Sequence, residues 1–148
     1  MEILEFMSRI GLAALAGLLI GAEREMKGKS AGLKTNALVA IGSSVFVLLS
    51  LEFRGEEFVD ITRVIGQIVT GIGFIGAGTI IQKAGSVSGL TTAATIWCSA
   101  GAGCLAALDM YKELIIVCAF ILVINFLFSY LTIKFNWETQ KKDDDITD

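Results

Sequence analysis

Five long apolar runs constrain the fold of this chain more than any other feature of its sequence. They cover about residues 4–22, 35–51, 63–81, 90–108 and 114–133. Each is close to the ~20 residues that a helix needs to cross a hydrocarbon core of about 30 Å. Because lipid offers the backbone no hydrogen-bond partners, and the alternating pattern of a membrane barrel is absent, these runs are predicted to be helices. We therefore predict an all-α, polytopic transmembrane helix bundle of about five spans, with residues 1–135 as the transmembrane domain.

The distribution of basic residues predicts how these spans are oriented, since Lys and Arg near span ends stay in the cytoplasm. One side of the predicted topology has eight basic residues: Arg24, Lys27, Lys29, Lys34, Lys83, Lys134, Lys141 and Lys142. The other side has four, Arg9, Arg54, Arg63 and Lys112. We predict an N-terminus outside and a C-terminus in the cytoplasm, with residues 136–148 as a short acidic cytoplasmic tail.

Residues 69–81, VTGIGFIGAGTII, contain the GxGxxG spacing of dinucleotide-binding loops. Such a loop needs an acidic residue about 20 positions later, but the first acid after Gly76 is Asp109. We interpret these glycines as helix-packing residues, because small side chains let lipid-embedded helices approach closely. The residues assigned to packing are Gly17, Gly21, Gly66, Gly71, Gly73, Gly76 and Gly78. Two alternatives stay open for the third run: contact on a second face, as in a dimer, or local unwinding that exposes carbonyls.

A shift of 57 residues aligns AGLKTNA (31–37) with SGLTTAA (88–94). The match suggests a parallel two-helix repeat, in which the first two spans correspond to the third and fourth. Each Gly-Leu-x-Thr segment opens a helix on the predicted cytoplasmic side, where helix N-termini attract anions. Two interpretations remain: simple capping by Thr35 and Thr92, or an anion site that also uses Lys34.

Ionisable residues within spans are functional candidates by default, because burying them is costly. Here they lie near span ends, with Glu5 and Arg9 at one end of the first run and Glu23 and Arg24 at the other; Arg63 and Gln67 open the third run. One expectation is a polar pocket between the first and third helices. The chain has no His, and its spans carry no carboxylate near their middle. We predict a non-enzymatic protein with no catalytic residue, cofactor or metal site.

Four blocks of this sequence resemble the signature blocks of the MgtC/SapB family of bacterial inner-membrane proteins. The blocks are GLLIGAERE (17–25), AGLKTNALVAIGSSVF (31–46), QIVTGIGFIGAG (67–78) and GLTTAATIWCSAGAG (89–103). The resemblance covers the membrane domain, without the soluble C-terminal domain that many members carry after the last span. It implies adaptation to low magnesium and a role in virulence, through binding and restraint of the F-type ATP synthase.

The blocks and the charge pattern together nominate functional candidates: Glu23, Arg24, Lys34, Thr35, Arg63, Gln67, Thr91, Thr92 and Trp97. Our first hypothesis is a regulator that binds another membrane complex, such as the F-type ATP synthase, in the bacterial cytoplasmic membrane. The alternative is an oligomeric transporter or channel for Mg²⁺ or another small solute. We expect the lipid bilayer as the surrounding medium, a homo-oligomer with a dimer favoured, and no nucleic-acid partner.

Overall fold

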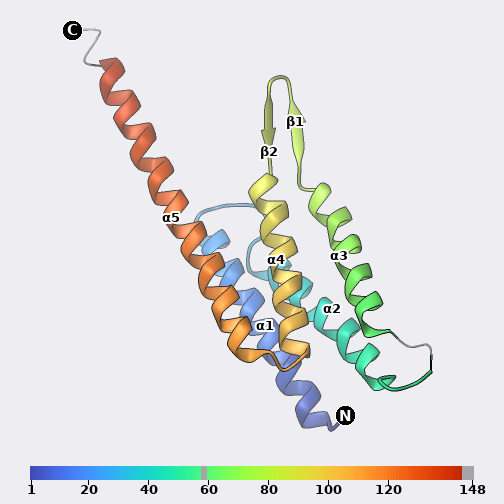
Figure 1. Cartoon of the computed structure of the whole chain (residues 1–148). Helices are drawn as coiled ribbons and strands as arrows, with labels where there is room; N and C mark the ends of the chain where they lie inside the picture. The colour runs from blue at the N-terminus through green and yellow to red at the C-terminus, as the bar shows by residue number, and fades with distance from the viewer. Residues whose placement is uncertain (58–59, 145–148) are drawn as a thin grey trace.

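The structure is a computed structural model that describes residues 1–57 and 60–144. Within that part of the chain it contains five helices and one short pair of strands (Figure 1). The elements are α1 (Ile3–Met26), α2 (Leu33–Glu52), α3 (Ile61–Ala77), β1 (Ile81–Lys83), β2 (Ser86–Ser88), α4 (Leu90–Ala107) and α5 (Tyr111–Asp144). Four of these helices are long and apolar enough to cross a membrane, and α3 is a shorter apolar helix. The prediction of an all-α polytopic helix bundle is confirmed.

Helix α4 is the central element of the bundle, because it packs against every other helix of the described chain. Helices α1, α2 and α4 contact one another and form the core. Helix α3 lies at one edge, against α4 and α2, and α5 lies at another edge, against α4 and α1 (Figure 1). The start of α1 and the end of α5 lie at opposite ends of the bundle (Figure 1). This arrangement agrees with an odd number of passes through one membrane.

Small residues let the core helices approach closely. The buried core is rich in alanine, including Ala13 and Ala16 of α1, Ala40 of α2 and Ala102 of α4. A Cβ built at Gly17 would lie 2.5 Å from the carbonyl oxygen of Asn36 in α2. Since the hydrophobic effect drives little association inside lipid, these close backbone contacts supply much of the packing energy.

The glycines of the third run are placed differently from those of α1. A Cβ at Gly21 would lie 2.7 Å from the Gly32 carbonyl oxygen, so Gly21 packs against the start of α2. On α3, by contrast, a Cβ at Gly66, Gly71 or Gly73 would meet no heavy atom within 4 Å beyond its own local backbone. Gly76 is the one buried residue of α3 and contacts Ala93 of α4. Most of the expected packing face on α3 is therefore not covered by another described helix of this chain.

The third run ends earlier than the sequence indicates. We expected a span to residue 81, but α3 ends at Ala77 and Gly78 is its C-cap. The Thr79 hydroxyl then donates to the Gly76 carbonyl at 2.7 Å, and the chain turns into β1. At about 1.5 Å per residue, the 17 residues of α3 reach ~26 Å, slightly less than a hydrocarbon core. At its other end, hydrogen bonds from Thr62 cap the helix and hold the pKa of Asp60 below its usual value.

An unpredicted hairpin connects α3 to α4. Strands β1 and β2 are antiparallel, with Gln82 paired to Val87. The hairpin closes on α4 at Gly89, which has a φ of +88°. A side chain there would be strained and would also overlap the Thr79 carbonyl. The hairpin cannot be recognised in the sequence, because its first apolar residues continue the apolar run of α3 without interruption.

Helix α5 is longer than the predicted span 114–133. It begins at Tyr111 and continues to Asp144, so residues 136–144 of the expected tail are helical. Residues 145–148 lie outside the described part of the chain. The apolar residues of α5 are widely exposed, among them Ile115 at 69% and Phe120 at 64%, as suits a helix at the lipid-facing edge of the bundle.

The close contact between α1 and α2 predicts unequal effects of two similar substitutions. We expect Gly17→Ala to lower the free energy of unfolding by about 1–3 kcal/mol, because its methyl group would overlap the α2 backbone. Gly11→Ala is the matched control, since a Cβ there meets nothing within 4 Å. Unfolding of the purified protein in mixed micelles, followed by circular dichroism, measures both. Equal stability of the two variants would contradict the packing described here.

Candidate functional site

Buried polar side chains gather at the end of the bundle where α1 ends and α2 and α4 begin. We call the following residues the polar cluster: Glu23, Arg24, Lys27, Asn36, Thr92 and Ser99. Glu23 and Arg24 are each 2% exposed, and Asn36 is fully buried. Charged side chains are almost never buried this deeply unless they are paired. The contacts of each member therefore decide what this site can do.

Arg24 connects three segments of the chain. Its guanidinium donates to the Ser30 carbonyl at 3.1 Å and to the Thr92 hydroxyl of α4. It thereby holds the loop after α1 against the first turn of α4. Thr92 is itself 5% exposed, so the bond is shielded from solvent. The arrangement joins two functional candidates that lie 68 positions apart in the sequence.

Asn36 makes a second junction, between α2 and α4. Its amide nitrogen donates to the carbonyls of Ala31, at 2.5 Å, and Gly32, at 2.9 Å. Its amide oxygen accepts from the Ser99 hydroxyl at 2.8 Å. The buried Asn36 side chain thus forms hydrogen bonds both with carbonyls of the loop before α2 and with a hydroxyl of α4. Asn36 and Ser99 were not among the predicted candidates, although a polar residue within an apolar span is a signal that could have identified them.

Glu23 and Lys27 form an ion pair that extends to α5. The Lys27 ammonium lies 2.6 Å from Glu23 Oε1 and donates to the Asn125 carbonyl at 3.0 Å. It also lies 4.4 Å from the centre of the Phe126 ring, within cation–π distance. Within residues 1–57 and 60–144, Glu23 Oε2 has no hydrogen-bond partner. The backbone carbonyl of Asn125, rather than its side chain, accepts this bond.

The two Gly-Leu-x-Thr segments are not equivalent in the structure. At the first, the Glu25 carboxylate accepts from the Leu33 backbone nitrogen at 3.2 Å, so the N-terminus of α2 already holds an anionic group of the chain. Lys34 and Thr35 are exposed there. At the second, the buried Thr92 is bound to Arg24. The N-terminus of α2 is therefore not free to bind an external anion, because the Glu25 carboxylate occupies it.

Arg9 forms the main ionic contacts at the opposite end of the bundle. It pairs with Glu5 and Asp109 and donates to the Ala107 carbonyl at 2.7 Å. Glu5 lies on α1, Ala107 ends α4, and Asp109 lies in the turn between α4 and α5. The expected polar pocket between the first and third helices is therefore wrong, since Arg9 turns toward the α4–α5 turn. Arg63 is exposed at the start of α3.

The remaining candidates lie on α3 and α4. Gln67 is exposed and lines a groove between α2 and α3. Trp97, which is 52% exposed, lines a separate groove of about 380 Å³ beside α3, α4 and α5. Thr91 is exposed, and its carbonyl accepts from the Thr95 hydroxyl at 2.8 Å. The structure therefore brings Glu23, Arg24 and Thr92 into one cluster and leaves the other candidates outside it.

The chemistry of the polar cluster is that of a fixed electrostatic junction. Its cations are engaged by a carboxylate, a hydroxyl and backbone carbonyls of the chain. No three His, Cys, Asp or Glu side chains of the described residues come together as metal ligands. The cluster joins α1 to α2, α4 and α5 near one end of the bundle.

Comparison with known proteins places this arrangement in a family. A family model described as the MgtC family matches residues 10–133. The chain belongs to the MgtC family. The match includes the whole polar cluster and confirms the resemblance carried by the four sequence blocks.

Named relatives within the MgtC family agree with this assignment. "Protein MgtC" of Salmonella typhimurium strain LT2 is 49% identical over 116 residues, which cover 75% of this chain and 49% of the relative. "Protein MgtC" of Brucella abortus strain 2308 is 45% identical over 113 residues, covering 76% of this chain and 47% of the relative. The chain spans about half the length of these curated relatives. No solved structure matches.

The unequal Thr positions predict unequal effects of removing their hydroxyls. We expect Thr92→Val to lower the free energy of unfolding by about 1–3 kcal/mol, because Arg24 would lose a buried hydrogen-bond acceptor. Thr35→Val is the matched control, since Thr35 is exposed. Denaturation in mixed micelles measures the difference. A Thr35→Val variant as unstable as Thr92→Val would show that the two turns are equivalent after all.

The Glu23–Lys27 pair predicts a second stability difference. Lys27→Met would leave the Glu23 carboxylate buried without its cation. We expect a loss of about 2–3 kcal/mol, less than for a fully buried pair because the Lys27 side chain is 22% exposed. The exposed Lys29→Met is the control. The double variant Glu23→Gln/Lys27→Met should recover part of the loss, and failure to recover any of it would argue against the pair as the cause.

Proposed function

We propose that this MgtC-family chain is a non-enzymatic membrane regulator that acts in adaptation to low magnesium by binding another membrane complex. The main support is the contrast between the buried charged side chains and the exposed face of α3. Each ion of the polar cluster has at least one partner within the chain, although Glu23 Oε2 and Arg24 Nε have none among the described residues. The small-residue face of α3, in contrast, is uncovered. Small residues are the usual means by which membrane helices bind one another. The uncovered face of α3 therefore provides a surface on which a helix of another protein can pack.

The contact face that supports binding consists of Gly66, Thr70 and Gly73. These residues lie on one side of α3 and are exposed, and the Thr70 hydroxyl is satisfied by the Gly66 carbonyl at 3.0 Å. The next residue along, Phe74, is 85% exposed and would add apolar contact area. A partner helix could therefore approach the α3 backbone without displacing a hydrogen bond.

The F-type ATP synthase is the partner that the family resemblance suggests, and the bacterial cytoplasmic membrane is the corresponding location. The orientation that we propose has the N-terminus outside and the C-terminus in the cytoplasm. It is supported by four basic residues at or just beyond the C-terminal ends of α1 and α3, which lie at the same end of the bundle (Figure 1): Arg24, Lys27, Lys29 and Lys83. A homodimer remains a second use of the same α3 face.

A flux measurement and a binding measurement together test this proposal. We expect no saturable Mg²⁺ uptake by liposomes that contain the purified chain alone. In cells grown at low magnesium, we expect Gly73→Leu to reduce co-purification of the F-type ATP synthase at least tenfold, because the new side chain blocks close approach. Gly11→Leu adds the same bulk to an open position on α1 and serves as the control.

The two measurements separate the competing functions. Saturable Mg²⁺ uptake that is lost in the Gln67→Ala variant would favour the transporter over the regulator. Equal co-purification of the Gly73→Leu and Gly11→Leu variants would remove α3 as the contact face.

A further inference from the structure

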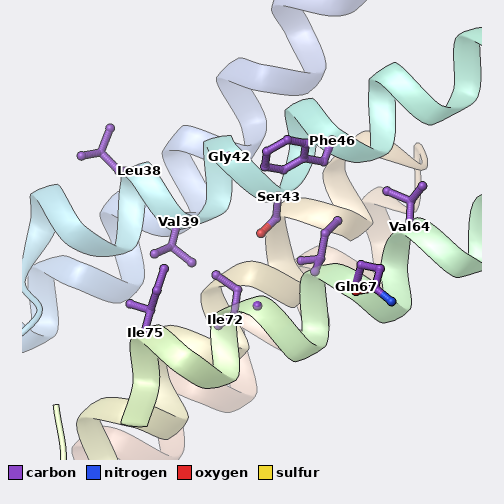
Figure 2. Close-up of a pocket in the computed structure, with 11 residues that line it drawn as sticks. Leu38, Val39, Gly42, Ser43, Phe46, Val64, Gln67, Ile72 and Ile75 are labelled. Atoms are coloured by element: carbon purple, nitrogen blue, oxygen red, sulfur yellow. The ribbon is translucent and has the colours of Figure 1, made fainter. Parts of the chain in front are cut away.

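A groove between α2 and α3 is not used by the polar cluster or by the exposed face of α3. It has a volume of about 610 Å³ and is lined by both helices along their middle turns (Figure 2). Nine of its eleven lining residues are apolar or glycine, and the two polar ones are Ser43 and Gln67. The volume falls within the range of about 300–1,000 Å³ typical of small-molecule sites.

The hydroxyl of Ser43 is the unusual feature of this groove. Ser43 is 3% exposed, and its Oγ has no hydrogen-bond partner within the described residues. By contrast, the hydroxyls of Ser50 and Thr70 donate to carbonyls of the preceding turn, those of Val47 at 2.8 Å and Gly66 at 3.0 Å. Ser44 shares the lack of a partner within the described residues but does not line the groove. Figure 2 shows the Ser43 oxygen directed away from α2 toward α3. A buried hydroxyl without a partner costs about 1–3 kcal/mol, which an occupant of the groove would recover.

The floor of the groove is also open where glycine lies. A Cβ at Gly42, beside Ser43, or at Gly71 on α3 would meet no heavy atom within 4 Å. The two glycines leave room beside the hydroxyl for a flat or narrow group. The groove is bordered by exposed apolar side chains, including Leu38 at 60% and Phe46 at 58%. Its opening therefore faces the apolar part of the bilayer.

The lining restricts the chemistry of an occupant. None of the described residues that line the groove is charged, so a carboxylate or phosphate group would be buried there without a counter-ion. Ser43 lies in the middle of α2, and Gln67 lies in the second turn of α3. Each can donate a hydrogen bond. An uncharged carbonyl oxygen on an apolar body meets all of these conditions.

We propose that the α2–α3 groove binds an uncharged, membrane-soluble molecule whose carbonyl oxygen accepts a hydrogen bond from Ser43. Two sources supply this chemistry in a membrane, an isoprenoid quinone and the ester carbonyl of a diacylglycerol. The site is separate from the α3 contact face, so its occupancy does not require that the proposed regulator function be correct. Gln67 supplies a second donor from the opposite wall.

Photolabelling of the full chain in nanodiscs of phosphatidylethanolamine and phosphatidylglycerol tests the proposal. One arm uses an azidobenzoquinone with a single isoprenyl unit, and the other a diacylglycerol that carries a diazirine. Unlabelled molecules of the same class serve as competitors. We expect one probe to label residues 38–46 or 64–75 saturably. Saturable labelling at these segments by neither probe would overturn the proposal.

Two pairs of variants assign the labelling to the groove. Ser43→Ala should weaken it about fivefold through the loss of one hydrogen bond. Ser44→Ala should leave it unchanged, because Ser44 is equally buried and unpaired but does not line the groove. Gly42→Leu should abolish labelling by filling the space, and Gly11→Leu should not.

Several outcomes would count against the groove as the site. Equal labelling of Gly42→Leu and Gly11→Leu, or equal effects of Ser43→Ala and Ser44→Ala, would overturn the proposal. So would loss of self-association in Gly42→Leu with labelling unchanged, since that result would show a second copy of the chain in the groove.

Discussion

The bundle depends on the close approach of α1, α2 and α4, which small residues make possible and buried hydrogen bonds hold in place. Gly17 and Gly21 allow α1 to lie against α2, and Gly103 allows α4 to lie against Ala40. At this separation Arg24 reaches Thr92. The polar contacts and the packing are thus one arrangement, because a wider helix spacing would leave buried polar groups without partners.

Sequence alone predicts much of the fold because membrane spans follow a simple rule of length and polarity. The apolar runs locate all five helices, and the spacing of Gly17 and Gly21 correctly indicates a packing face on α1. The end of α3 could not be found in this way. Apolar residues continue beyond the end of α3 as far as Ile81. The helix itself ends at Ala77, with Gly78 as its C-cap and the Thr79 hydroxyl bonded to the Gly76 carbonyl. Local hydrogen bonding sets the C-terminal end of α3, and the hydrophobicity of the sequence does not reveal such bonds.

The candidate site was predicted only in part, for a related reason. Glu23, Arg24 and Thr92 stood out by charge or by their place in a repeated segment, but their partners are fixed by tertiary contacts. The suggested repeat shows this clearly. Gly32 and Gly89 are both the N-caps of the helices that follow them, as a shift of 57 residues requires. Glu25 then caps α2, whereas the aligned position in the second half is Gln82 of the hairpin. Similar segments therefore acquired different surroundings.

The ionic contacts of α1 also have a consequence for how the chain is assembled in the membrane. Arg9 pairs with Asp109 and donates to the Ala107 carbonyl, and Lys27 donates to the Asn125 carbonyl. Each partner lies about 100 positions further along the chain. During synthesis α1 enters the bilayer long before these groups exist. Its buried ions must therefore stay near the two interfaces, where water and head groups can solvate them, until α4 and α5 arrive. The first helix to be made is in this sense among the last to reach its final environment.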